Sequence, residues 1–426
     1  MTKPTDFVPQ SRALGSEERF VELATVPACS RGARRRKAGL SVLMLADDRH
    51  PANVVQDHIA AFTMYSRHRI RVINPIHEPV TSAGRAWRYD LILIHYSIFV
   101  LGEYFLPTPW CDFVCRFPGM KAQIIQDEYR YINAMKRRMA ELGVHAVFSS
   151  LDRQNLERVY GGDLLASTRF YSCLPGYIAE TFRAFNPPPI SARPLDIVYR
   201  GRTILPHLGR LAQRKRIIGE QMAELARRYG LKADIASREE SRIYGNAWTD
   251  FLMRGRATLG VEGGASIFDF EGEIEAAAQR YSSEHPAASF EQVWSAVLAP
   301  HEGNIVHQTL TPKLLEAIAA KTALILYPGK YRGILEPERH YIPLQPDASN
   351  AWEVVSRLRD TNYLQELVNR TFDEIMSRED LSKTFYIRQL DSVVAERFIS
   401  TVRWPRDLTA LARRFIASAS FACSRP

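Results

Sequence analysis

The residues from Thr309 to Gly329 read TLTPKLLEAIAAKTALILYPG, and this stretch decides the fold. A helix is expected to begin after Thr311, because threonine caps helix N-termini well and Pro312 at the first helical position gives up only an N–H that the helix could not use. The apolar run Ala323–Tyr327 then predicts a buried parallel strand. A helix followed by a buried strand is the repeating unit of an α/β protein.

The same alternation of helix and strand fills both halves of the chain. In the first half, the runs that predict strands are Leu40–Ala46, Arg69–Asn74, Leu91–His95, Gln123–Gln126 and Ala146–Ser149. In the second half they are Asp196–Tyr199, Ala233–Ala236, Ala257–Val261 and Ala323–Tyr327, with a long charged helix predicted over Arg210–Tyr229. We therefore predict an α/β fold of two doubly wound, Rossmann-like domains that face each other across a cleft, with ligands bound outside the carboxyl ends of the strands.

A proline-rich break over residues 185–194, FNPPPISARP, separates the two halves. Its prolines cannot continue a helix or an internal strand, so we predict the interdomain linker here. The chain then divides into a basic flexible tail (1–38), an N-terminal Rossmann-like domain (39–185), a linker (186–195), a C-terminal Rossmann-like domain (196–379) and C-terminal helices that pack back on the first domain (380–426).

Composition favours a soluble protein and argues against several classes. Of the 426 residues, 46% are apolar and 24% are charged, and no apolar run approaches the length of about 20 residues that spans a bilayer. The first ten residues lack the apolar region of a signal peptide, and the five scattered cysteines give neither a disulfide framework nor a zinc site. We therefore expect a cytoplasmic protein.

The net charge of +9 is concentrated near the N-terminus. Residues 1–37 hold eight Lys or Arg against four Asp or Glu. The cluster Arg31–Lys37, RGARRRK, is suited to peripheral contact with anionic lipid at the inner face of a membrane. A solvated terminal tail accounts for it as well, so both interpretations stay open.

Glu316 is the residue most suggestive of a binding site. It is expected one turn inside the helix that begins after Thr311, where a carboxylate can accept both hydroxyls of a ribose. The helix N-terminus offers N–H groups to a diphosphate, and Lys313 adds a cation. The alternative is an ordinary amphipathic helix with a solvated glutamate.

The segment TPKLLEAIAAKTALILYPG resembles the donor-site segment of the GT-B glycosyltransferases, in which a P-x-x-x-E-A-x-A-x-G/K-x stretch precedes a hydrophobic strand. A broader resemblance, to bacterial glycosyltransferases that include the CgeB-like proteins, takes in Asp47–His68, Gln126–Tyr129 and Leu259–Gly272. It implies that Glu316 binds the ribose of a UDP- or GDP-sugar. It also implies that sugar moves to a hydroxyl of a saccharide or lipid-linked acceptor, as in polysaccharide biosynthesis, with no nucleic acid partner.

The sequence departs from the best-known pattern of that superfamily at one position. Many retaining members carry a second acid eight residues before the ribose-binding glutamate, and Gln308 stands there. An amide can hydrogen-bond a sugar hydroxyl but brings no negative charge. Whether the reaction retains or inverts the anomeric configuration therefore stays open.

The second domain also offers residues for a diphosphate. Arg200, Gly201 and Arg202 directly follow a predicted strand, so Gly201 is expected to let the backbone approach the diphosphate while Arg202 pairs with it. GT-B enzymes commonly stabilise the leaving diphosphate with such groups, so the resemblance implies no bound cofactor and no metal. The alternative is that the arginines line a surface turn.

The first domain offers candidates for the base that activates the acceptor. His58 lies on the first helix and titrates near neutral pH, Asp127 and Glu128 follow a strand, and His95 ends another strand. If the reaction inverts, we expect His58 or Asp127 to be the base. Two rival functions stay open: a nucleotide-sugar epimerase on the same fold, and a non-catalytic binding module whose affinity would fall steeply with salt.

Overall fold

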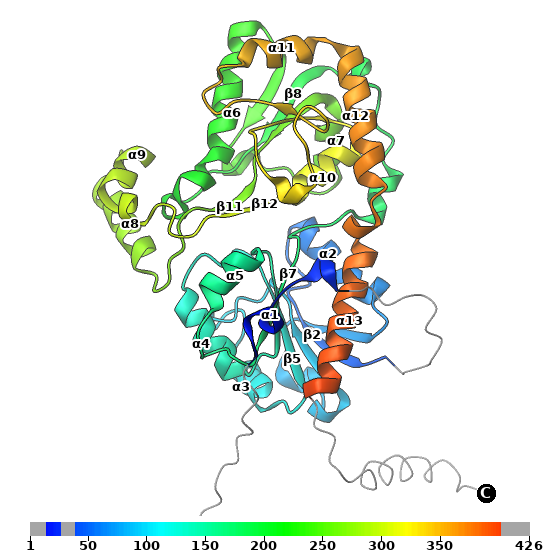
Figure 1. Ribbon diagram of the computed structural model, residues 1–426, viewed down its shortest axis with the longest axis vertical. Coiled ribbons are helices and arrows are strands. Elements are labelled where there is room, and N and C mark those ends of the chain that lie inside the picture. The colour runs from blue at the N-terminus through cyan, green and yellow to red at the C-terminus, as the bar shows by residue number, and fades with distance from the viewer. Residues whose placement is uncertain (1–13, 27–38, 402–426) are drawn as a thin grey trace, which may run out of the picture.

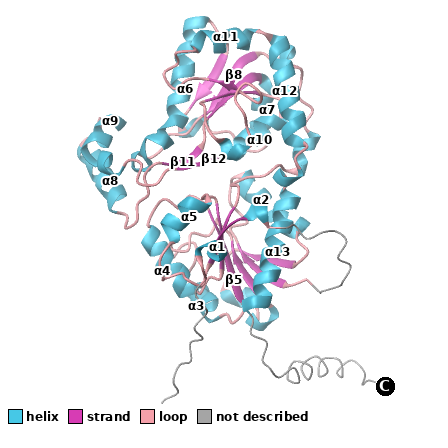
Figure 2. Cartoon of the chain, in the orientation of Figure 1, coloured by secondary structure: helices cyan, strands magenta, loops and turns pink. Residues whose placement is uncertain are grey.

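The computed structural model describes residues 14–26 and 39–401, and two parallel sheets organise them (Figure 1). The first sheet has the order β1-β7-β6-β5-β4-β2-β3 and the second has the order β14-β13-β10-β8-β9. Helices cover both faces of each sheet (Figure 2). The predicted α/β fold of two doubly wound domains is confirmed.

The first sheet consists of β1 (Phe20–Glu22), β2 (Ser41–Leu45), β3 (Arg69–Ile73), β4 (Leu91–Ile94), β5 (Met120–Ile125), β6 (Ala146–Ser149) and β7 (Arg169–Ser172). Its helices are α1 (Ser16–Arg19), α2 (Asn53–Tyr65), α3 (Thr108–Arg116), α4 (Ile132–Leu142) and α5 (Arg153–Tyr160). Every residue of the central strands β4 and β5 is buried. β4 reads as the continuous apolar run LILI because both faces of the sheet are covered, whereas β5 also buries Lys121 and Gln123.

The second sheet consists of β8 (Leu195–Arg200), β9 (Ala233–Ala236), β10 (Gly255–Gly260), β13 (Ala323–Leu326) and β14 (Ile342–Pro343). Its helices are α6 (Gly209–Tyr229), α7 (Asn246–Arg254), α10 (Pro312–Ala319), α11 (Ala351–Arg359) and α12 (Thr361–Met376). Between β10 and α10 the chain forms a small antiparallel pair, β11 (Gly263–Ala265) with β12 (His307–Thr309), and between these two strands lie α8 (Glu273–Glu284) and α9 (Phe290–Val293).

Part of the predicted N-terminal tail belongs to the first domain. Phe20–Glu22 forms the edge strand β1 in parallel register with β7, so the tail prediction is wrong for residues 14–26. Burial of Phe20, which stacks on Phe170 at 5.6 Å, and of Leu23 holds this strand in place. The remaining tail residues, including Arg31–Lys37, lie outside the described residues, and lipid contact through that cluster stays a prediction.

The chain crosses between the sheets twice. Residues 173–194 lead from β7 to β8 through two short 3₁₀ turns, Glu180–Ala184 and Ile190–Ala192. The last described helix, α13 (Lys383–Thr401), runs back beside α2, and its Tyr386 and Ile387 are buried in the core of the first domain. Within the described residues no helix is long and apolar enough to cross a membrane.

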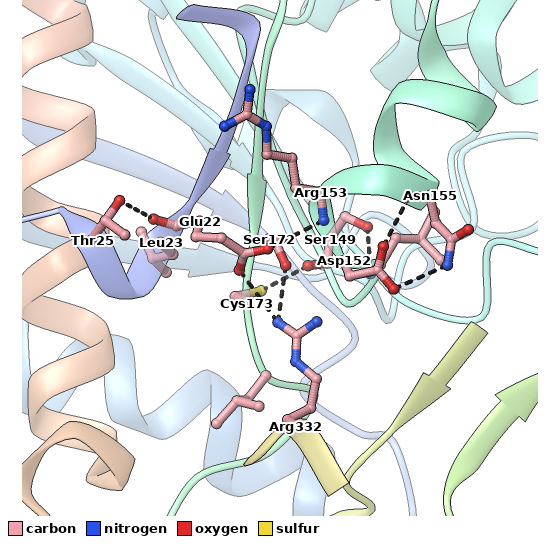
Figure 3. A network of polar contacts seen from close by, with 12 residues as sticks. Glu22, Leu23, Thr25, Ser149, Asp152, Arg153, Asn155, Ser172, Cys173 and Arg332 are labelled. Atoms are coloured by element: carbon pink, nitrogen blue, oxygen red, sulfur yellow. Dashed lines mark hydrogen bonds and ion pairs between the residues drawn. The ribbon is translucent and has the colours of Figure 1, made fainter. Parts of the chain in front are cut away.

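A polar contact also joins the domains at the carboxyl end of β7. Arg332, from the loop after β13, points into the first domain in Figure 3, where its Nη2 donates to Ser172 Oγ at 3.0 Å. The same nitrogen lies 3.5 Å from Glu22 Oε2 on β1. The edge strand β1 therefore supplies an acid to the interdomain contact.

Candidate active site

A cavity of about 570 Å³ lies between the two domains at the carboxyl ends of β8 and β10. The first domain contributes the start of α2, from Ala52 to Asp57, and the crossing segment contributes Phe182 and Phe185. The second domain contributes loops and helix starts that include Arg200–Arg202, Arg242–Trp248 and Thr311–Glu316. This is the position in which doubly wound sheets bind their ligands.

Glu316 faces this cavity because of the packing of α10. Leu314, Leu315, Ala317 and Ile318 are buried in the core of the second domain, and the opposite face of the helix is left to Glu316. Trp248 Nε1 on α7 donates to Glu316 Oε2 at 2.6 Å. Burial raises the pKa of Glu316, while the hydrogen bond from Trp248 and the charge of Lys313 oppose that rise.

Five cationic residues line the same cavity. Arg200 pairs with Asp234 and Arg242 pairs with Glu239. The other three are Arg202, Lys215 and Lys313. Lys313 Nζ lies 5.0 Å from the centroid of the Trp248 ring. Burial lowers the pKa of Lys215, and the negative charge of Asp127 opposes that shift. Their charges and the start of α10 give the cavity the means to hold a diphosphate.

The two residues beside Arg202 have structural roles. Arg200 pairs with Asp234 at 2.7 Å and lies over the ring of Phe251 at 4.2 Å. A Cβ at Gly201 would lie 2.4 Å from Ser237 Oγ and 3.2 Å from the carbonyl oxygen of Lys215, so the chain is closely packed here. Gly201 also lines the cavity.

Thr311 and Gln308 differ in their position relative to the cavity. Thr311 lines the cavity and occupies the N-cap of α10, although its side chain makes no capping hydrogen bond. Gln308 does not line the cavity, and its Nε2 donates to Glu262 Oε2 at 2.9 Å. Glu262 is buried and also accepts from the backbone N–H of Tyr331 at 2.8 Å. The amide of Gln308 is therefore used in a polar contact beneath the site.

His58, a predicted base, is buried away from the residues that line the cavity. Its side chain is buried, it does not line the cavity, and its Nδ1 lies 2.8 Å from His95 Nε2. Burial, with a smaller effect of the charge on Lys383, lowers the pKa of His58 to about 3. The helix instead presents Asp57 to the cavity, 3.5 Å from Lys383 Nζ.

Asp127 is exposed and lies just beyond the residues that line the cavity. Its backbone has a φ of 56°, in the left-handed region that residues with side chains seldom adopt. Burial and then the negative charge of Asp127 raise the pKa of Tyr129, and the same charge acts on Lys215 across the cleft. Its use as a base stays a prediction.

The candidates selected from the sequence do not include Trp248, Asp57 or Lys215. All three line the cavity, yet each is a single residue outside any recognisable spacing. No group of three or more His, Cys, Asp or Glu side chains suited to a metal ion occurs in the described part of the chain. That observation leaves the predicted metal independence untested.

Solved glycosyltransferase structures resemble this fold. An α-glucosyltransferase in complex with UDP and a 13-mer DNA containing an HMU base matches with a TM-score of 0.51 at 9% identity, over 84% of this chain and 100% of that one. An α-glucosyltransferase with UDP-glucose and DNA containing an abasic site matches with a TM-score of 0.51 at 8% identity, over 84% and 99% of the two chains. Anabaena HepE in complex with UDP-glucose has a TM-score of 0.45 at 9% identity, over 84% and 100%.

These likenesses establish the fold as that of the GT-B glycosyltransferases. No protein-family model matches the sequence, and no characterised protein matches it by sequence. The expectation of no nucleic acid partner is overturned, because two glycosyltransferases of the same fold are seen with DNA. Neither the fold nor a basic chain of net charge +9 supports that exclusion.

Proposed function

We propose that the protein transfers a sugar from a nucleoside-diphosphate sugar to an acceptor hydroxyl. The observation that carries this proposal is a cavity lined by Glu316 together with cations that include Arg202, Lys215 and Lys313. A carboxylate suited to ribose hydroxyls and cations suited to phosphate are what a nucleoside diphosphate requires. The assignment to the CgeB-like type rests on the sequence motifs alone and is part of the proposal.

The donor we propose is a UDP-sugar. Glucosyltransferases of this fold are seen with UDP and with UDP-glucose. Glu316 holds the ribose, and Lys313, Arg202 and Lys215 neutralise the diphosphate, assisted by the N-terminus of α10. These protein cations stabilise the charge that develops on the leaving diphosphate, so we propose that catalysis requires no added metal.

The acceptor is activated from the first domain. We propose that the carboxylate of Asp127 accepts the proton of the acceptor hydroxyl as its oxygen bonds to the anomeric carbon. The bond from that carbon to the diphosphate breaks in the same step, and the electron pair leaves with the diphosphate. The rate enhancement then comes from holding the two reactants in line and from neutralising the departing diphosphate.

A nucleic acid is the first acceptor to test. The neighbour with UDP is bound to DNA that contains an HMU base, and the positive net charge of this chain favours a polyanion. The experiment incubates the full chain with UDP-[¹⁴C]glucose and a DNA oligonucleotide carrying an HMU base, with EDTA present. Transfer of label to the oligonucleotide, lost in Glu316→Gln, is the expected result.

Three outcomes would redirect or contradict the proposal. Label recovered as a free epimerised nucleotide sugar would identify an epimerase. Label that stays in UDP-glucose with every acceptor, together with no binding of UDP by calorimetry, would contradict the proposed function. Activity that appears only when Mn²⁺ replaces EDTA would overturn the metal independence.

A further inference from the structure

The segment between β11 and β12 belongs to the second domain by connectivity but packs on the first. In Figure 1 it carries α8 and α9 away from the second sheet, on the same side as α4 and α5. Ala265, Phe268 and Ile305 from this segment are buried in the core cluster of the first domain. The segment is therefore firmly docked on the acceptor side of the cleft.

Backbone hydrogen bonds fix this segment to the loop that follows β5. The N–H of Asp269 donates to the carbonyl of Tyr129 at 2.9 Å, and the N–H of Asn133 donates to the carbonyl of Phe270 at 2.9 Å. The ring of Phe268 lies edge-on to that of Tyr129 with centroids 6.3 Å apart. The loop that bears Asp127 thus takes part of its hydrogen bonding from the second domain.

A two-pronged ion pair reinforces the contact. Arg130 donates from Nε to Glu275 Oε2 at 2.7 Å and from Nη2 to Glu275 Oε1 at 2.6 Å. The side chain of Glu275 is only 2% exposed, and Gln279 also donates to it at 3.1 Å. Asp269 accepts from the backbone N–H of Glu275 at 2.8 Å, which holds the start of α8 in place. The side chain of Arg130 is 41% exposed, so the pair joins a partly exposed cation to a buried carboxylate, and its two parallel hydrogen bonds make it directional.

The loop held in this way has a left-handed backbone at both ends, with a φ of 56° at Asp127 and of 50° at Tyr131. Asp enters this region more readily than most residues, but a tyrosine persists there only where its surroundings over-determine it. The second domain supplies such surroundings, because Glu275 pairs with Arg130 and the carbonyl of Asp269 accepts from the N–H of Ile132, on either side of Tyr131.

The other end of the segment reaches the donor cavity. A Cβ on Gly263 of β11 would lie 2.8 Å from Thr311 Cγ2 and 3.9 Å from Lys215 Nζ, and both of those residues line the cavity. One continuous segment therefore runs from the cations of the cavity to the loop of Asp127. It can set the position of an acceptor-side group relative to the donor.

We propose that residues 263–275 clamp the Asp127 loop in register with the donor cavity, which makes Arg130 and Glu275 positioning residues for sugar transfer. This inference rests on the proposed function. A purely structural role for the ion pair would lower stability in its variants without separating turnover from donor binding.

The test uses Arg130→Gln and Glu275→Gln in the full chain. Both remove a charge while keeping hydrogen-bonding capacity, and Arg130→Gln leaves the buried glutamate with Gln279. The matched control is Arg216→Gln, whose side chain pairs with Glu220 within α6, away from the first domain. Three quantities are measured: UDP affinity by calorimetry, the rate of UDP release from UDP-glucose with the HMU oligonucleotide, and hydrogen exchange of amides 126–133.

If residues 263–275 act as a clamp, both variants should lose turnover while keeping their affinity for UDP. In both variants we expect kcat to fall roughly ten- to a hundred-fold, because misplacing a reacting group by about 1 Å has effects of that size. The Kd for UDP should stay within about twofold, and amides 126–133 should exchange at least about tenfold faster. The control should match the wild type in all three.

Unchanged exchange in both variants would overturn the clamp. Faster exchange with unchanged kcat would overturn the positioning role, because the loop would then be mobile without consequence. A wild-type protein that neither binds UDP nor turns over UDP-glucose would contradict the proposed function instead, and the exchange rates of the variants would still decide the clamp.

Discussion

The two sides of the cleft differ in how directly the sequence reveals them. On the donor side, Glu316, Lys313 and Thr311 come from one contiguous segment, and the structure brings them together with Arg202 around one cavity. On the acceptor side, His58 is buried and Asp127 lies beyond the cavity lining. A site built by one helix and its cap can be recognised in a contiguous stretch of sequence. A site built by the loops of several strands depends on how the domains pack.

The largest effect on activity is expected from a substitution on the acceptor side of the cleft, at Asp127. Asp127→Asn keeps the shape of the side chain but removes its capacity to take a proton. We expect kcat for sugar transfer to fall by roughly 10²- to 10⁴-fold while UDP affinity is retained. Steady-state kinetics with labelled UDP-glucose provide the measurement. A variant with nearly wild-type kcat would remove Asp127 from the mechanism.

The next effect concerns the diphosphate. Arg202→Gln should weaken UDP binding about tenfold, since a hydrogen bond between charged groups is worth roughly 1.5–3 kcal/mol, and should leave uridine binding unchanged. Calorimetry with UDP and with uridine separates the contribution of the diphosphate to binding from that of the nucleoside. Equal losses for both ligands would show that Arg202 acts on the nucleoside or on the fold.

A smaller effect should come from the hydrogen bond to Glu316. Trp248→Phe keeps an aromatic ring beside Lys313 but removes the N–H that donates to Glu316 Oε2. We expect a loss of about 1 kcal/mol in UDP binding at pH 8, that is, roughly fivefold.

The pH dependence of that variant gives a second readout. The hydrogen bond from Trp248 holds down a pKa of Glu316 that burial raises, and nearby Lys313, Asp57 and Lys383 keep their charges in the variant. Without the N–H the pKa rises further, so protonation removes the ribose acceptor at a higher pH. As pH is lowered, the UDP affinity of the variant should therefore begin to fall at a higher pH than that of the wild type. Parallel profiles would contradict this role.

The smallest effect on activity is expected from His58→Gln. Because His58 does not line the cavity, kcat should stay within about twofold of the wild type. The change should appear in stability, because the folded state depresses the pKa of His58 to about 3 while the unfolded chain titrates near its ordinary value. The unfolded state then binds more protons below pH 6.5 or so, and folding stability falls as pH drops.

Urea denaturation at pH 7 and pH 5 tests this linkage. The fall in the free energy of unfolding between the two pH values should be smaller in His58→Gln than in the wild type. Other buried histidines such as His145 and His307 remain in both proteins and contribute equally. A loss of transfer activity with unchanged stability would restore His58 as a base.

Much of the fold could be predicted because central parallel strands are buried on both faces. The runs LILI at Leu91–Ile94 and ALIL at Ala323–Leu326 are apolar throughout for that reason. The edge strand β1 was missed because it has three residues and pairs with β7, about 150 residues later in the chain. A short strand completed by a distant partner leaves no local period to detect.

Residues of the candidate site also depend on contacts between segments far apart in the sequence. Asp57 and His58 are neighbours on α2 and point about 100° apart, so only one of them can face the cavity. His58 packs against Phe62 on the same helix and against Tyr386 on α13, and this packing leaves Asp57 to face the cavity. α13 follows more than 300 residues later in the chain. Trp248 likewise acquires its role only when α7 and α10 meet. Neither outcome is contained in a local pattern.

The most direct test of the central claim compares the binding of UDP and 2′-deoxy-UDP by wild-type protein and by Glu316→Gln. If the carboxylate of Glu316 accepts the ribose hydroxyls, wild-type protein should bind UDP about tenfold more tightly than the deoxy analogue, and this preference should largely vanish in the variant. An equal preference in the two proteins, or none in the wild type, would contradict the assignment of this cavity to a nucleotide-sugar donor held by Glu316.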